Sequence, residues 1–165
     1  MTISIILATT ADGGMGLDNA LPWKHIPGDM VWFRKHTLNK MIVMGRKTWE
    51  SLPKRPLPNR INVVLSFRDV PDADFTVAPV LDNPAAVVES LKALAGDMEI
   101  VIIGGAVVYS YLWPFVNKVY HTCVKQDYPA DTFFKITDDH LQGWYKETAQ
   151  ECDLCAFHIY TRPAS

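Results

Sequence analysis

The sequence predicts a three-layer α/β fold, in which helices cover both faces of a mostly parallel central sheet and the C-terminal edge is antiparallel. Apolar runs of strand length recur along the whole chain, with helical stretches between them. Runs such as Ile100–Ile103 show no alternation of apolar and polar residues, as expected for strands that are covered on both faces. Strands that alternate with helices favour a parallel sheet.

Seven apolar runs have the length of β-strands and are bounded by turn residues. The last two are long and are separated only by loops, so we expect antiparallel pairing at one edge of the sheet. The predicted strands span Ile3–Thr9, Lys40–Gly45, Ile61–Ser66, Phe75–Ala78, Glu99–Gly104, Val116–Lys125 and Cys155–Arg162.

Four stretches between these strands have helical character. The first begins with a proline and carries the acid Asp29 in its first turn, both of which favour a helix start. Its residues Met30, Phe33 and Thr37 are spaced along one face. The predicted helices span Pro27–Leu38, Arg46–Leu52, Pro84–Leu94 and Ala106–Leu112.

Length and charge limit the class of protein. The 165 residues contain no repeat, low-complexity tract or Pro/Gly-rich linker, so one domain over residues 1–165 is expected. A net charge of −2 argues against a nucleic-acid binder held by phosphate contacts, but is compatible with a local basic pocket for a phosphorylated small molecule. Residues 1–7 are apolar, yet they lack a basic flank and are too short to span a bilayer. The expectation is a cytoplasmic protein, monomeric by default, with no membrane or nucleic-acid partner.

The three cysteines are an odd number in a chain long enough to fold without cross-links, which suits a reducing cytosol. Cys152 and Cys155 form a lone C-x-x-C motif, with no second pair to complete a zinc site. The motif does not lie at a predicted strand-to-helix turn, where redox-active pairs are common. The sequence therefore favours plain thiols over a metal or redox role, and predicts no metal site.

Two predicted strands end in glycine directly before a helix, where ligands bind in α/β sheets. The pair Gly104-Gly105 lets backbone approach a ligand, and the helix start attracts phosphate, although a double glycine alone is equally consistent with a tight turn. Gly45 precedes Arg46 and Lys47, two cations that oppose the positive end of a helix unless an anion binds there. We interpret the two loops as holding parts of one dinucleotide.

A glycine-rich segment, residues 11–23, leaves the first strand and has the composition of a mobile lid. Asp29 follows it. An acid in the first turn of a helix gains about 0.3–1 kcal/mol from the helix dipole without any catalytic role. Spacing alone therefore does not make Asp29 catalytic.

Five motifs in order resemble those of the dihydrofolate reductases, and the resemblance covers nearly the whole chain. Five matches in the right order and spacing are very rare by chance. They are Ala20–Trp23 followed by Asp29 and Phe33, then Met44–Ser51, Arg55–Arg60, Ile103–Gly105 and the pair Asp131-Thr132, which in this family supports the lid.

The resemblance implies reduction of 7,8-dihydrofolate to 5,6,7,8-tetrahydrofolate by hydride transfer from NADPH, a step of tetrahydrofolate biosynthesis and one-carbon metabolism that antifolates inhibit. Asp29 would hold the pterin amino group and ring nitrogen and promote protonation of N5, and Thr122 resembles the hydroxyl that orients this acid. Arg60 would grip the carboxylate of the substrate's glutamate tail. Arg46 and Arg68 would recognise the 2′-phosphate that distinguishes NADPH from NADH.

The resemblance also implies two sets of binding residues. Those expected to contact the substrate are Ile6, Leu7, Asp29, Phe33, Leu52, Arg55, Leu57, Arg60, Ile103, Tyr109 and Thr122. Those expected to contact the cofactor are Ala8, Met15, Gly16, Asn19, Ala20, Leu21, Gly45, Arg46, Lys47, Thr48, Leu65, Ser66, Phe67, Arg68, Gly104, Gly105, Ala106, Val107, Val108, Tyr109 and Thr132.

The sequence departs from the family pattern at three places. Asp29 lies six positions after Trp23, where many bacterial members place the acid five positions after the tryptophan, and His25 looks like the added residue. Pro53-Lys54 adds length before the arginine-proline motif. Phe67 stands where a small hydroxyl residue is common, so phosphate recognition would depend more on Arg68.

Three alternatives remain. A non-catalytic dinucleotide sensor would not need Asp29, Phe33, Arg60 and Thr122 together. A pyrimidine reductase of riboflavin synthesis shares the fold, but leaves Arg60 unexplained. An interaction protein presenting Arg55–Pro58 as a polyproline ligand would need that segment exposed and extended.

Overall fold

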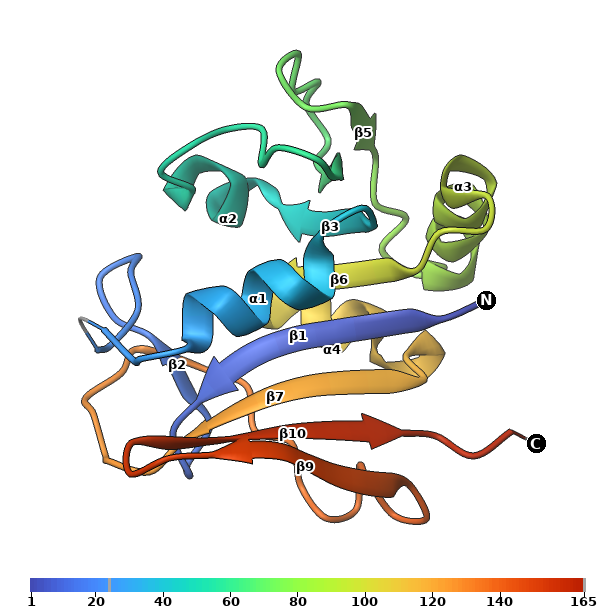
Figure 1. Cartoon of the computed structure of the whole chain (residues 1–165). Helices are drawn as coiled ribbons and strands as arrows, with labels where there is room; N and C mark the ends of the chain where they lie inside the picture. Colours follow the sequence, from blue (N-terminus) through green and yellow to red (C-terminus); the bar gives the residue numbers. More distant parts are fainter. Residues whose placement is uncertain (24, 165) are drawn as a thin grey trace. The chain divides into compact units, whose positions relative to one another are not determined.

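The computed structural model describes residues 1–23 and 25–164 and contains both helices and sheet (Figure 1). Contacts divide the chain into two compact units. The first contains Met1–Ile5 and Thr37–Val116, and the second contains Ile6–His36 and Asn117–Ser165. Strand β1 (Ile3–Thr9) begins in the first unit and ends in the second.

A parallel sheet forms the centre of the first unit. Its strands lie in the order β5-β4-β3-β6-β1, and each of these strands pairs in parallel with its neighbours. Strands β3 and β6 are apolar without alternation, and Met41–Met44 and Ile100–Ile102 have no exposed surface. Full burial of each such side chain stabilises the fold by about 1.5–3 kcal/mol, which places the core of this unit at the sheet. The strands are β3 (Met41–Gly45), β4 (Ile61–Leu65), β5 (Phe75–Val77) and β6 (Ile100–Gly104).

Helices α2 (Arg46–Ser51), α3 (Pro84–Ala95) and α4 (Ala106–Leu112) belong to the same unit, and a 3₁₀ turn follows α4 at Trp113–Phe115. Helix α3 has a well-defined start, because the Asn83 side chain accepts a hydrogen bond from the Ala86 N–H at 3.3 Å and a proline opens the first turn. Its apolar stripe is buried and consists of Val87, Val88, Leu91 and Ala95.

The second unit contains an antiparallel edge. Strand β10 (Cys155–Thr161) pairs antiparallel with β7 (Lys118–Val124) on one side and with β9 (Tyr145–Glu151) on the other, and β1 lies next to β7. The predicted antiparallel C-terminal edge is therefore confirmed. Helix α1 (Asp29–Thr37), apart from its last residue, belongs to this unit, as does a small sheet of β2 (Gly14–Gly16) and β8 (Thr132–Phe133).

All the predicted strands and helices are present, with ends that differ by a few residues at most. Strand β9 was not predicted, because all seven residues of Tyr145–Glu151 are exposed and give no apolar alternation. On the helix face that carries Met30, Phe33 and Thr37, the Met30 side chain of α1 is 66 % exposed. Trp32 is buried instead, with its ring centroid 4.9 Å from that of Phe157 on β10.

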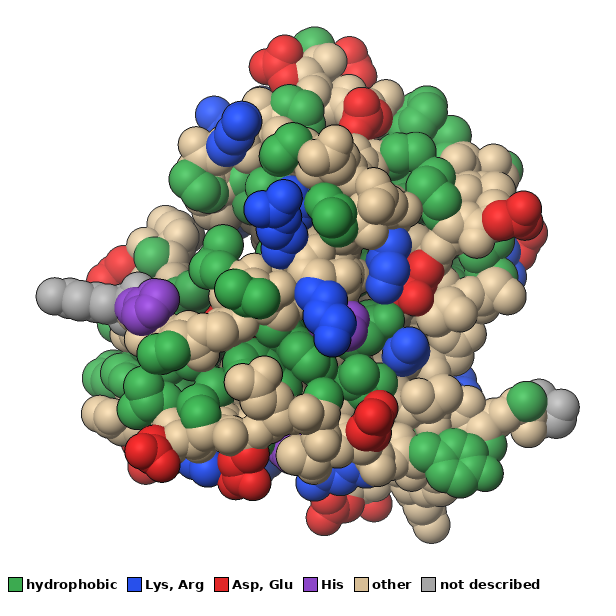
Figure 2. All heavy atoms as spheres, viewed as in Figure 1, with side chains coloured by type: hydrophobic (Ala, Val, Ile, Leu, Met, Phe, Trp, Pro, Cys, Tyr) green, Lys and Arg blue, Asp and Glu red, His purple; other side chains and the backbone are tan. Residues whose placement is uncertain are grey.

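None of the helices in the described part of the chain combines the length and the apolar character needed to cross a bilayer. Figure 2 shows both acidic and basic side chains on the face in view, in keeping with the small net charge of −2. The expectation of a single domain over residues 1–165 stays a prediction.

Candidate active site

Asp29 is the first residue of helix α1 and lies directly after Gly28, whose φ of +85° favours glycine. The Asp29 side chain is half-buried, and the Thr122 hydroxyl on β7 donates a hydrogen bond to its Oδ1 at 2.9 Å. Burial raises the pKa of the Asp29 carboxyl above its usual value, and the hydrogen bond from Thr122 offsets part of that rise. A carboxyl with a raised pKa beside a buried hydroxyl is a candidate acid–base group.

The packing of α1 on the antiparallel edge fixes this pair. Thr122 is 1 % exposed and is the register partner of Phe157 on β10. The Phe157 ring packs on Trp32, and a side chain added at Gly28 would lie 3.6 Å from the same ring. The start of α1 is thereby held close to the strand that carries Thr122.

One further predicted substrate residue shares the helix with Asp29. Phe33 lies four residues after Asp29, so both side chains lie on the same face of α1, and Phe33 is half-buried. Ile6 and Leu7, also in the second unit, are buried in β1. An acid and apolar side chains in one unit suit a flat heterocycle that carries hydrogen-bond donors.

The predicted lid segment is folded onto another part of the second unit. Strand β2 pairs with β8, and the Asp131 carboxylate accepts a hydrogen bond from the Asp18 N–H at 3.0 Å. The Asp131 N–H donates to the Gly16 carbonyl at 2.8 Å. The pair Asp131-Thr132, which the sequence motif linked with the lid, therefore contacts it directly. Whether the lid moves stays a prediction.

The predicted cofactor residues of the second unit belong to this segment or to strands next to it. Ala8 is half-buried in β1, and Leu21 is 51 % exposed. The segment turns back through a bridge between Leu17 and Ala20. The remaining predicted cofactor residues of this unit are Met15, Gly16 and Asn19 in the segment and Thr132 on β8.

The carboxyl ends of three parallel strands meet at one edge of the first unit. Gly45 is in register with Leu65, and Met44 with Gly104, so β3, β4 and β6 end together. This edge is where ligands bind in open parallel sheets. The predicted cofactor residues of this unit lie at it or in the turns and helices that follow: Gly45, Arg46, Lys47, Thr48, Leu65, Ser66, Phe67, Arg68, Gly104, Gly105, Ala106, Val107, Val108 and Tyr109.

The two glycine loops lie side by side within this edge. A Cβ added at Gly45 would lie 3.2 Å from Val108 of α4, and one added at Gly104 would lie 3.3 Å from the Thr48 hydroxyl of α2. Gly104 has a φ of +138°, a conformation that side chains rarely adopt. Backbone and helix starts are thus crowded into a small area, as the dinucleotide interpretation requires.

Three polar groups near this edge have specific surroundings. Arg46 lies 3.8 Å from Glu50, an exposed pair that accounts in part for a cation at the start of α2. Tyr109 is fully buried, and burial raises the pKa of its hydroxyl. After β4, the Ser66 hydroxyl accepts a hydrogen bond from the Arg68 N–H at 3.1 Å, whereas Phe67 is 71 % exposed.

Arg60 is held by its own loop. Its guanidinium donates hydrogen bonds to the Thr37 hydroxyl at 3.0 Å and to the Pro58 carbonyl at 2.9 Å. Arg60 and Lys40 both line a surface hollow of about 360 Å³. The fully buried Asn62 shapes the loop by hydrogen bonds to the backbone of Leu57 and Arg60, a role that sequence reasoning missed. The only available signal was a polar residue inside an apolar strand.

Three other predicted substrate residues of the first unit have different degrees of burial. Leu52 and Ile103 are half-buried, and Arg55 is exposed, with one hydrogen bond of 3.5 Å to the Glu50 carbonyl. The Leu57 N–H is bonded to the Asn62 side chain, so the Arg55–Pro58 segment is not a free polyproline strand.

The second unit thus carries a half-buried acid held by a buried hydroxyl, and the first unit carries a glycine-lined edge of a parallel sheet. These features define an α/β enzyme of the nucleotide-dependent class. The dihydrofolate reductase family profile matches residues 2–161. The chain belongs to the dihydrofolate reductase family.

Individual relatives agree with the profile. A dihydrofolate reductase of Haemophilus influenzae is 39 % identical over 167 aligned positions, which cover 98 % of this chain and 99 % of the relative. One of Neisseria gonorrhoeae is 40 % identical over 138 positions, covering 84 % and 82 %. The solved structure of a dihydrofolate reductase from Enterococcus faecalis complexed with NADP(H) and RAB-propyl matches with a TM-score of 0.77 and 28 % identity, covering 99 % of this chain and 97 % of that one.

Proposed function

We propose that this protein reduces 7,8-dihydrofolate to 5,6,7,8-tetrahydrofolate with NADPH as the reductant. The observation that carries the proposal is the half-buried Asp29 carboxyl, which accepts a hydrogen bond from the buried Thr122 hydroxyl at 2.9 Å and shares a helix face with Phe33. Because the chain belongs to the dihydrofolate reductase family, we assign this acid to the reduction of dihydrofolate.

Asp29 binds the pterin and controls a proton. An ionised carboxylate has about four acceptor positions, and Thr122 uses one of them, so Asp29 can also accept hydrogen bonds from the pterin amino group and ring nitrogen. The half-buried setting strengthens these bonds, because the surrounding dielectric is low. The negative charge of the ionised carboxylate beside the pterin favours protonation of the ring at N5.

Side chains and backbone of this chain also suit the cofactor. At the edge formed by Gly45, Leu65 and Gly104, two glycines without side chains let backbone approach phosphates, and Arg46 and Arg68 are close to it in the sequence. NADPH, when bound, supplies the hydride that reduces C6 of the pterin. Apolar residues exclude water from the reacting atoms, and alignment of two rings can contribute roughly 7–11 kcal/mol to the rate.

The direct test is the loss of NADPH absorbance when the purified protein is mixed with dihydrofolate. Steady oxidation of NADPH that depends on dihydrofolate is the expected result. A protein that binds NADPH but never oxidises it would instead be a sensor, and one that reduces a ribosylated pyrimidine would be a riboflavin-pathway reductase. Inhibition by an antifolate in the same assay would show that the pterin site carries the activity.

Arg68 is expected to determine the preference for NADPH over NADH. The 2′-phosphate carries up to two negative charges, and a guanidinium can bind it with two hydrogen bonds. Arg68→Leu should lower kcat/KM for NADPH by about 10–100-fold, the loss of one or two charge-assisted hydrogen bonds. Activity with NADH should change little. Equal losses with both cofactors would contradict this role, and the exposed Lys54→Leu serves as a control for charge alone.

Arg60 is expected to bind the glutamate tail of dihydrofolate. Arg60→Leu should raise the KM for dihydrofolate by about 10–100-fold with a much smaller change in kcat, because the tail is remote from the reacting atoms. Arg60→Lys keeps the positive charge but loses the paired donors of the guanidinium. Its KM for dihydrofolate should lie between those of the parent protein and Arg60→Leu. Thermal unfolding of each variant separates this effect from loss of the bonds to Thr37 and Pro58. An unchanged KM in a folded Arg60→Leu variant would remove Arg60 from the tail site.

We further propose that the protein acts as a monomer in the cytoplasm on small molecules alone, without nucleic-acid or membrane partners. The small net charge supports this, since a phosphate-binding surface needs an excess of Lys and Arg. Gel filtration at the concentration of the assay is the measurement that checks the oligomeric state.

A further inference from the structure

Two thiols meet at the turn that joins β9 to β10. The Sγ atoms of Cys152 and Cys155 are 3.4 Å apart, about 1.4 Å more than the length of a disulfide bond. The Cys152 N–H donates to the Cys155 carbonyl at 2.8 Å, which closes the turn and holds the two residues together. The sequence alone favoured plain thiols, because the C-x-x-C motif has no second pair for a zinc site and does not lie at a predicted strand-to-helix turn. The structure brings them into contact.

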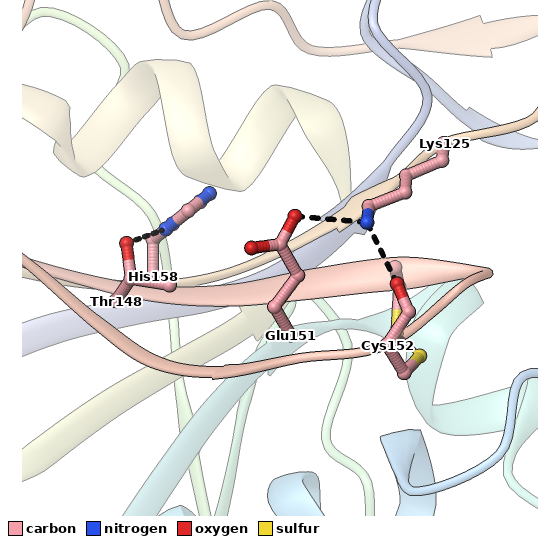
Figure 3. Close-up of polar contacts among 6 residues, drawn as sticks. Lys125, Thr148, Glu151, Cys152 and His158 are labelled. Carbon is pink, nitrogen blue, oxygen red and sulfur yellow. Dashed lines mark hydrogen bonds and ion pairs between the residues drawn. The ribbon is translucent and has the colours of Figure 1, made fainter.

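The turn is held at the end of strand β7 by a lysine. The Lys125 ammonium donates to the Cys152 carbonyl at 2.7 Å and to the Glu151 carboxylate at 2.9 Å, as Figure 3 shows. The Lys125 N–H donates to the Leu154 carbonyl at 2.9 Å. These bonds limit the freedom of the turn and place a cation near Cys152, a setting that favours a thiolate.

The two thiols differ in exposure and in acidity. Cys152 is half-buried, whereas Cys155 is fully buried at the start of β10. Hydrogen bonds from the Leu154 backbone and from the Cys155 thiol lower the pKa of the Cys152 thiol. Burial raises the pKa of Cys155, and so does the neighbouring Cys152 when it is charged. This asymmetry suits one attacking thiol and one resolving thiol.

The third cysteine does not share this environment. Cys123 on β7 is the register partner of Ala156, and Val124 is the partner of Cys155. Partners across an antiparallel pair point to the same face and neighbours along a strand to opposite faces, so Cys123 and Cys155 lie on opposite faces of the sheet. Cys123 is therefore a matched internal control.

We propose that Cys152 and Cys155 form a reversible redox dithiol, in which small disulfides such as oxidised glutathione convert the pair into an intramolecular disulfide. The Cys152 thiolate attacks one sulfur of the small disulfide, forms a mixed disulfide and releases one small thiolate, which takes up the proton. Cys155, once deprotonated, then attacks the Cys152 sulfur and releases the second small thiolate. Two protein thiols are oxidised, one small disulfide is reduced to two small thiols, and atoms and electrons balance.

Formation of the mixed disulfide also prepares the second step. Capping Cys152 removes its negative charge and its hydrogen bond to Cys155, and both of these raise the pKa of Cys155 in the reduced protein. The resolving thiol thereby ionises more readily only after the first step. The proposal does not depend on the reductase activity.

Cys155 lies on β10, the strand that also carries Phe157, which packs against the helix of Asp29. Phe157, two residues after Cys155, is the register partner of Thr122 and packs on Trp32 of α1. The Asp29 charge also contributes to the raised pKa of Cys155. The dithiol and the acid are therefore close enough to interact electrostatically.

The test uses the full-length folded protein in mixtures of reduced and oxidised glutathione. After acid quenching, free thiols are alkylated and counted by intact mass, and peptide mapping locates any bond. We expect the loss of two alkylation sites, a peptide in which Cys152 is joined to Cys155, and full return of both sites on adding dithiothreitol. Cys152 should react at least about tenfold faster than Cys123.

Three variants sharpen this result. Cys155→Ser should accumulate a glutathione adduct at Cys152, Cys152→Ser should lose the rapid reaction, and Cys123→Ser should behave like the parent protein. If Cys155→Ser fails to fold, Cys155→Ala gives the same reading, and the titration of the parent protein stands without any variant. The proposal is overturned if both thiols stay alkylatable in oxidised glutathione, or if Cys123 reacts as fast as Cys152.

Discussion

Asp29→Asn is expected to lower turnover at neutral pH by about 10²–10⁴-fold, the typical contribution of a positioned acid–base group. The amide keeps the size of the side chain and can still accept the hydrogen bond that Thr122 donates at 2.9 Å. It cannot carry the negative charge that favours a protonated pterin. Affinity for NADPH, measured by fluorescence titration, should stay within about twofold of the parent protein, because the expected cofactor edge is formed by other residues.

The pH profile gives this prediction its specificity. As the pH falls, more of the dihydrofolate in solution takes up a proton without help, so kcat of Asp29→Asn should rise towards acid while that of the parent protein levels off. A variant that simply misfolds would not regain activity in acid. Normal turnover of Asp29→Asn at neutral pH would show that Asp29 has no role in the proton transfer.

Unfolding of the same variant serves as its control. Burial raises the pKa of Asp29 in the folded state, so the folded protein holds this proton to a higher pH than the unfolded chain, whose value is 3.8. The stability that the group contributes is therefore present below that value and is lost as the pH rises through the folded pKa. Asp29→Asn should be at least as stable as the parent protein at pH 7 in urea unfolding. A loss of stability at pH 7 would mean that the charged form is favoured by the fold.

The elements that the sequence predicted best are those whose side chains are buried on both faces. Residues 41–44 and 100–102 form continuous apolar runs that only a covered strand explains, and both runs have no exposed surface. Strand β9 has no such apolar run, because its residues are exposed. Its position is set by pairing with β10. Edge strands depend on their partners, which single-sequence patterns do not contain.

The site followed a different rule. The contact between Thr122 and Asp29 joins residues 93 positions apart, and neither position is unusual alone. The pairing of Thr122 with Asp29 was predicted only from the family resemblance. The glycine edge was predicted from the spacing of strand, glycine and helix along the sequence. Met30 shows the limit of helical periodicity, because the choice of buried face depended on the rings of Phe157 and Tyr120, which pack against Trp32 from other strands.

Gly104→Ala is expected to have the second large effect, because backbone and space both exclude a side chain there. The φ of +138° is nearly restricted to glycine, and placing alanine in such a conformation costs about 1–3 kcal/mol. The new Cβ would also lie 3.3 Å from the Thr48 hydroxyl and 3.6 Å from the Tyr109 hydroxyl, which is fully buried. For a chain of about this length the midpoint of thermal unfolding should fall by about 2–4 °C per kcal/mol.

Gly105→Ala is the matched control, one residue along the chain. Gly105 has a φ of −91°, which any residue adopts, and its added Cβ would meet the Thr48 hydroxyl at 3.6 Å, an ordinary contact. Its unfolding midpoint should stay close to that of the parent protein. In Gly104→Ala the backbone must shift to relieve strain, and this shift changes the direction of the N–H groups at the start of α4. The Kd for NADPH should therefore rise about tenfold or more, equivalent to about 1.4 kcal/mol. Equal stability of the two variants would show that the conformation of Gly104 is not what requires glycine at this edge.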